Sequence, residues 1–108
     1  MRALVCREFG ALERLCVEQW PEPALADDKA RIAVTAAGVS FANTVVLDGR
    51  HQNTPELPFI PGTELAGVVV DKGARCEGIA LGQTVVASVP KGAFATHAHI
   101  APRDLYAI

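Results

Sequence analysis

The chain has 108 residues, of which 50% are hydrophobic and 20% charged, and its formal net charge at pH 7 is −2. This length predicts one domain, residues 1–108, and the apolar content excludes an intrinsically disordered chain. The near-neutral charge offers no electrostatic attraction for nucleic acid or for an anionic membrane surface.

The first third of the chain predicts strands and a hairpin, because short apolar runs end at Gly or Pro. Residues 2–6 and 12–19 form the expected hairpin, with Phe9, Gly10 and Ala11 as its turn. Residues 29–36 alternate as a half-buried strand does, and the alternation places one set of side chains on the core face: Ala30, Ile32, Val34 and Ala36.

The remaining chain also predicts strands, separated by one long irregular region over residues 38–61. We expect a single helical turn near 41–47 within that region. A long ordered loop in a compact domain is usually functional, so we also expect the region to contribute to a site. Residues 64–72 and 83–89 are rich in valine and predict strands buried on both faces, and residues 93–100 alternate again. The expected fold is mainly β, a partly open barrel with long irregular loops and little helix.

The cysteines and the apolar runs predict a cytoplasmic protein. Cys6, Cys16 and Cys76 are an odd number without a C-x-x-C pair, which favours a reducing compartment. The apolar run at the N-terminus is too short for a signal peptide. The uncharged stretch 32–47 is too short and too polar to span a bilayer.

Glycine-rich segments do not predict a nucleotide site. Gly62–Gly67 and Gly73–Gly78 have the gap of a P-loop, but Val68 and Ile79 follow where the phosphate-binding lysine is required. The sequence also lacks the G-x-G-x-x-G fingerprint of dinucleotide-binding domains.

The histidines are better explained as polar surface residues than as metal ligands. His97 and His99 point the same way on a strand and could share a metal, but a zinc site needs a third protein ligand. A polar strand face is the simpler interpretation, and His51 lies in a polar stretch typical of a loop tip.

Residues 57–70 carry the most informative local signal. Glu64 follows a Pro-Gly turn and enters an otherwise apolar strand, either as an exposed strand start or as a site residue. Gly67 within that strand predicts a bulge or a second backbone passing closely.

Three segments together resemble the medium-chain dehydrogenase/reductase family, and within it the zinc-independent quinone oxidoreductase branch. They are residues 36–43 (AAGVSFAN), 57–69 (LPFIPGTELAGVV) and 82–85 (GQTV). The opening MRALV and the late segment 92–97 (GAFATH) match in order, so the resemblance covers nearly the whole chain. It implies a GroES-like domain (the alcohol dehydrogenase N-terminal type), the substrate-side part of such enzymes.

The departures from the family pattern imply that the domain binds no zinc. Ser40 and Thr63 stand where the zinc-dependent members have a ligand cysteine and a ligand histidine, and hydroxyls are poor zinc ligands. Where the quinone reductase branch has asparagine, aspartate and tyrosine, this chain has Ser40, Asn43 and Val45.

The resemblance implies an NADPH-dependent reductase of a small quinone or enone, with the cofactor held by a Rossmann domain that is absent from these 108 residues. The chain alone is then expected to bind no cofactor and to be inactive, and a separate Rossmann domain is one possible partner. The residues implied to contact substrate or nicotinamide are Ser40, Phe41, Asn43, Val45, Thr63 and Glu64. The alternative is a truncated, non-catalytic module that binds a partner or itself through the surface that the missing domain would cover.

Overall fold

The structure is a computed structural model and describes residues 1–10, 12–50 and 54–108. It contains seven strands: β1 (Arg2–Val5), β2 (Cys16–Gln19), β3 (Ala30–Ala37), β4 (Glu64–Lys72), β5 (Thr84–Ser88), β6 (His97–Ile100) and β7 (Leu105–Ala107). The α-helix α1 (Phe41–Leu47) lies between β3 and β4, and short 3-10 helices occur at Leu12–Arg14 and Pro102–Asp104.

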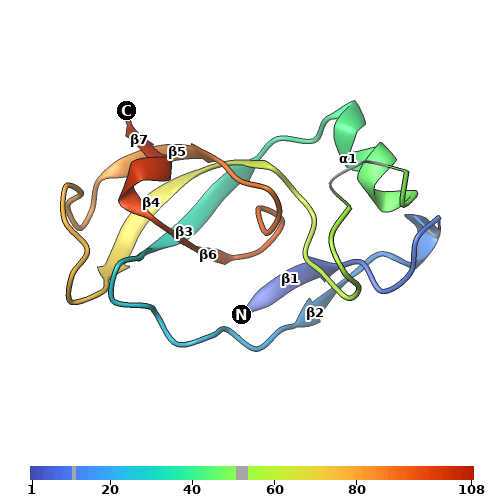
Figure 1. Ribbon diagram of the computed structural model, residues 1–108, viewed down its shortest axis with the longest axis horizontal. Helices are drawn as coiled ribbons and strands as arrows, with labels where there is room; N and C mark the ends of the chain where they lie inside the picture. The colour runs from blue at the N-terminus through green and yellow to red at the C-terminus, as the bar shows by residue number, and fades with distance from the viewer. Residues whose placement is uncertain (11, 51–53) are drawn as a thin grey trace.

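The strands form an antiparallel sheet of five and a separate hairpin (Figure 1). The sheet has the order β6-β3-β4-β5-β7, and β1 pairs only with β2. Isolated bridges from Ala3 to Ala95 and from Cys6 to Phe59 join the hairpin to the rest of the chain. The sheets are connected but not closed, so the mainly β, partly open barrel is confirmed.

The predicted hairpin is present, but its second strand is shorter than expected. β2 starts at Cys16 rather than at residue 12, because Leu12–Arg14 form a 3-10 turn. Gly10 has φ of 77° in the connection, a conformation that favours glycine. Ala11 of the predicted turn lies outside the described residues.

The alternation predicted for β3 holds only for its first half. Ala30 and Ile32 are fully buried, whereas Ala36 is exposed. The register against β4 shifts between Val34 and Ala36, and such a bulge adds a residue that turns the following side chains to the other face. The prediction of Ala36 on the core face was therefore wrong.

The valine-rich strands are buried on one face rather than on both. In β4, Leu65 and Val69 are buried while Val70 is 44% exposed. In β5, Val85 and Ala87 are buried between exposed Thr84 and Ser88. One side of the antiparallel sheet stays partly open, which antiparallel sheets allow.

Two hydrophobic clusters hold the domain together. The larger is formed mainly by side chains of the five-stranded sheet and includes Ile32, Leu65, Val69, Val85 and Ile100. The smaller consists of Cys6, Leu47 and Phe59, with Phe9, Leu15 and Val46 packed against it. It fixes the last turn of α1 against the chain next to the hairpin, so the helix has a defined place beside β1 and β2 (Figure 1).

The helical segment predicted near 41–47 is confirmed, since α1 covers these seven residues, although it makes about two turns rather than the single turn predicted. The strand predicted over 93–100 is regular only from His97, since Ala95 forms an isolated bridge. His51 lies outside the described residues. Within the part of the chain that the structure describes, no helix has the length and apolar character needed to cross a membrane.

Candidate functional site

The six predicted site residues lie at the starts of α1 and β4, and the backbone brings these two places together. The Gly38 N–H donates to the Glu64 carbonyl oxygen at 3.1 Å. A Cβ added at Gly38 would lie 2.9 Å from Oε2 of Glu64, so the carboxylate rests against the bare glycine backbone. The segment before α1 and the first residue of β4 are therefore neighbours.

Ser40 and Asn43 form the N-terminal cap of α1. The Ser40 backbone N–H donates to Oδ1 of Asn43 at 2.8 Å, and the Asn43 N–H donates to the Ser40 carbonyl at 3.1 Å. The Ser40 hydroxyl lies 3.4 Å from the same Oδ1. Asn43 is only 3% exposed, so its carboxamide supports the loop from within, while half-buried Ser40 lies nearer the surface.

The exposed residues beside this cap are apolar. Val39 is 81% exposed and Phe41 is 80% exposed. Val45, one turn further along α1, is half-buried. Large apolar side chains that project on either side of a polar cap give the surface an apolar wall next to a hydroxyl.

A groove of about 540 Å3 begins at Glu64 and crosses the open face of the sheet. Its floor is a register row across four strands, Ala36, Ala66, Val86 and Tyr106. Glu64 pairs with Ser88 in the neighbouring row, at the start of β4, where Gly38 also lines the groove. The groove thus has a flat apolar floor and a polar end.

Thr63 immediately precedes the polar end of the groove. It is half-buried, and its carbonyl oxygen accepts the Val89 N–H at 2.8 Å, which extends the pairing of β4 with the chain after β5. Glu64 is exposed and begins the strand, as one of the two interpretations of the sequence expected. The structure therefore places Thr63 and Glu64 together where the central strand β4 begins, and of the six predicted site residues Glu64 alone lines the groove.

Among residues 1–10, 12–50 and 54–108, no group of three or more His, Cys, Asp or Glu side chains is placed to hold a metal ion. His97 and His99 have separate partners instead. His97 Nδ1 lies 3.1 Å from the Thr96 hydroxyl, and His99 Nε2 lies 2.7 Å from Oε2 of Glu22.

Two features of the region were not predicted from the sequence. Tyr106 joins the groove only because β7 pairs with β5, and a three-residue strand near residue 105 carries no strong signal of its own. The position of Gly38 against Glu64 depends on the register between β3 and β4, which contains a bulge that alternation cannot locate.

Comparison with known proteins gives consistent matches. A family model described as the alcohol dehydrogenase GroES-like domain matches residues 26–106. The quinone oxidoreductase-like protein 2 homolog of Nematostella vectensis is 36% identical over 92 residues, which cover 84% of this chain and 25% of the relative.

Solved structures agree over the whole chain. The human synaptic vesicle membrane protein VAT-1 homolog-like protein superposes with a TM-score of 0.93 at 32% identity, covering 100% of this chain and 35% of the other. The quinone oxidoreductase of Thermus thermophilus, solved alone and with NADPH, gives a TM-score of 0.81 at 28% identity, over 97% of this chain and 31% of that one. The chain spans about a quarter to a third of the length of these relatives.

Proposed function

The chain belongs to the family of alcohol dehydrogenase GroES-like domains, and we propose that it is the substrate-side domain of a zinc-independent, NADPH-dependent reductase of quinones or enones. The observation that carries this proposal is the groove whose polar end, Glu64 and Gly38, lies beside the capped start of α1. Relatives named as quinone oxidoreductases, one of them solved with NADPH, support the reaction class.

The shape of the site suits a flat, weakly polar molecule. Phe41 and Val45 provide the apolar wall for a quinone or nicotinamide ring, and the Ser40 hydroxyl provides a hydrogen bond to a carbonyl oxygen. Thr63 and Glu64 support the polar end, while buried Asn43 acts through the Ser40 backbone. Few polar groups in an otherwise apolar site are typical of small-molecule binding.

The hydroxyl groups of Ser40 and Thr63, which stand where zinc-dependent relatives have zinc ligands, favour a reaction without zinc. Zinc in proteins is held mainly by thiolate, imidazole and carboxylate, and the Ser40 and Thr63 hydroxyls are poor substitutes for the first two. Without zinc, polarisation of the quinone or enone carbonyl depends on hydrogen bonds from the protein and on how the substrate is oriented in the groove.

The residues present fit the ring of a nicotinamide cofactor but not its phosphates. The sequence lacks a G-x-G-x-x-G loop, and the groove floor is apolar, so the described residues of the groove offer no cradle for a pyrophosphate. NADPH, when bound, supplies the hydride, and the protein orients the acceptor. We therefore assign cofactor binding to a separate nucleotide-binding domain, which leaves this chain inactive alone.

A simple assay tests this assignment. The purified chain is mixed with NADPH and a small quinone, and cofactor oxidation is followed by absorbance. We expect no turnover above the uncatalysed rate, because orienting both reactants accounts for about 7–11 kcal/mol of a barrier. Turnover that saturates with NADPH would contradict the proposal.

A second candidate function is self-association, which the exposed apolar side chains favour. Val39 and Phe41 are 81% and 80% exposed on either side of Ser40 in the sequence, and apolar surface of this kind is found at interaction sites. Sedimentation velocity over a wide concentration range tests it. Association that weakens in Phe41→Ser but not in Leu81→Ser, a comparable change at another exposed position, would support a module of this kind.

A further inference from the structure

A second cavity shares no lining residue with the groove at Glu64. It has a volume of about 380 Å3 and is lined by the chain before β3, the loops at 58–60 and 89–92, and strand β6. This volume lies within the range of small-molecule sites, roughly 300–1,000 Å3. None of the six predicted site residues lines it. We name it the His97 pocket, after the histidine on its wall.

The walls of the His97 pocket are mostly apolar, with a few polar groups. Pro23, Ile60 and Ile100 contribute apolar surface, and Trp20 lines the same cavity. The polar side chains are Glu22, Lys91, His97 and His99. Such a lining favours a ligand with an apolar body and one polar group.

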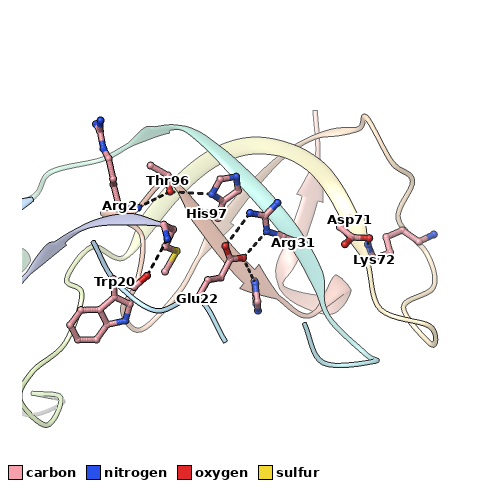
Figure 2. A network of polar contacts seen from close by, with 10 residues as sticks. Arg2, Trp20, Glu22, Arg31, Asp71, Lys72, Thr96 and His97 are labelled. Carbon is pink, nitrogen blue, oxygen red and sulfur yellow. Dashed lines mark hydrogen bonds and ion pairs between the residues drawn. The ribbon is translucent and has the colours of Figure 1, made fainter. Parts of the chain in front are cut away.

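The carboxylate of Glu22 already has its full set of partners (Figure 2). Oε2 accepts from Nε of Arg31 at 2.6 Å, Oε1 accepts from Nη2 of Arg31 at 3.0 Å, and His99 Nε2 lies 2.7 Å from Oε2. The hydrogen bonds from Arg31, together with the contact to His99, lower the pKa of Glu22 from 4.5 to about 2. Glu22 therefore stays ionised and paired. Because its charge is already balanced, it does not select a ligand with a cationic group.

His97 is poised to donate a hydrogen bond. Burial lowers the pKa of His97, and the nearby Arg31 guanidinium lowers it further, which favours the neutral form of the ring. The Thr96 hydroxyl oxygen accepts the Arg2 N–H at 3.3 Å and lies 3.1 Å from His97 Nδ1 (Figure 2). With the hydroxyl hydrogen directed to Nδ1, the ring hydrogen is assigned to Nε2.

The charge around the His97 pocket is positive. The charges of Glu22 and Arg31 cancel in their ion pair. The exposed Lys91 ammonium and the Met1 ammonium, which donates to the Trp20 carbonyl oxygen at 3.1 Å, remain. The chain as a whole carries −2, so this local excess is opposite in sign to the molecule. A donor at His97 and a cation at Lys91 both select a ligand that brings a negatively charged acceptor.

We propose that the His97 pocket binds a small aromatic carboxylate, with the ring on the apolar wall and the carboxylate between His97 and Lys91. The aromatic ring matches the apolar walls, and the planar carboxylate matches the two nitrogen donors. This site is independent of the groove at Glu64, so it does not depend on the proposed function.

Benzoate is the probe, followed by 1H–15N NMR on the intact chain, with benzamide and acetate as matched compounds. Benzoate is expected to cause saturable shifts at the amides of Gly92 and His97–Ile100. Benzamide keeps the ring without the charge and acetate keeps the charge without the ring. Each is expected to bind about tenfold more weakly, as loss of one charged or apolar contact predicts.

Two variants localise the binding. Lys91→Gln changes an exposed side chain and is expected to weaken benzoate binding about threefold to tenfold, whereas Lys29→Gln, the same change outside the pocket, leaves it unchanged. His97→Leu is expected to abolish the shifts at β6, and a thermal melt shows whether it folds. Shifts that never saturate, equal binding of benzamide, or benzoate binding that Lys91→Gln leaves unchanged would each overturn the proposal.

Discussion

At the scale of single residues, Gly67 shows how one missing side chain permits the fold. A Cβ at this position would collide with the Ala33 carbonyl oxygen and would lie 2.6 Å from Cγ2 of Ile32. The neighbouring strand β3 passes directly over the glycine, where Val34 pairs with Gly67 next to the bulge. The close approach expected from a glycine inside an apolar strand is confirmed.

Gly67→Ala is therefore expected to lower the free energy of unfolding by roughly 1–3 kcal/mol, since backbone has to move to admit the methyl group. Gly38→Ala is the matched control, because its Cβ would meet only the end of the exposed Glu64 side chain, which can rotate away. Its expected loss is about 0.5 kcal/mol or less. Urea unfolding of both variants measures the difference, and equal losses would contradict this explanation.

At the scale of elements, the start of α1 depends on the buried carboxamide of Asn43. The sequence predicted a helical turn near 41–47 and placed Asn43 among the polar site residues. It gave no indication that the side chain turns inward, because burial depends on how α1 packs beside Phe59 and Cys6. The packing of distant residues thus decides which of Ser40 and Asn43 lies nearer the surface.

Asn43→Ala is expected to destabilise the protein by about 1–2 kcal/mol, because the Ser40 N–H loses its acceptor inside the protein. Asn43→Asp keeps an acceptor oxygen at the same place and is expected to lose less. Hydrogen exchange of the Ser40 amide, measured beside urea unfolding, should be faster in Asn43→Ala than in Asn43→Asp. An unchanged exchange rate in Asn43→Ala would show that the cap is not needed.

The segment between β2 and β3 is held by contacts that the sequence could not predict. Glu22 lies in an irregular stretch between prolines, and its partners Arg31 and His99 lie 9 and 77 residues away. Alternation identified β3 and the polar side of β6, but no spacing rule pairs either strand with Glu22. Hydrogen bonds across such separations follow from the register of β3 against β6, which places Arg31 opposite His99.

The contacts of Glu22 with Arg31 and His99 predict a specific dependence of stability on pH. The pKa of Glu22 falls from 4.5 to about 2 on folding, so its contribution is fully present above pH 4.5 and is lost as the pH falls towards 2. With allowance for solvent screening, we expect this contribution to be about 1–2 kcal/mol.

Glu22→Gln removes the titrating group, so its free energy of unfolding is expected to fall less steeply between pH 4.5 and 2 than that of the unmodified chain. Glu77→Gln, at an exposed position, is the control and should keep the steep dependence. Denaturant unfolding at several pH values provides the measurement. Parallel curves for the chain and Glu22→Gln would refute the assignment.

At the scale of the whole molecule, the resemblance predicted from three short segments is confirmed. The family match over residues 26–106 and the superposition on a quinone oxidoreductase agree with it. What the resemblance could not supply is the detailed geometry: the bulge that exposes Ala36, the groove floor that ends in Tyr106, and the His97 pocket. These depend on register and loop packing, which a motif does not specify.

The central claim is that this domain supplies the substrate side of a reductase whose cofactor is bound elsewhere. A chimera tests it most directly, in which residues 1–108 replace the matched segment of the Thermus thermophilus quinone oxidoreductase, beside the isolated chain and the unmodified enzyme. Binding of NADPH by the chimera is measured first, to show that its cofactor domain is folded. We predict that the chimera oxidises NADPH with a small quinone while the isolated chain does not. A chimera that binds NADPH but reduces neither quinones nor enones would contradict the claim, as would turnover by the isolated chain.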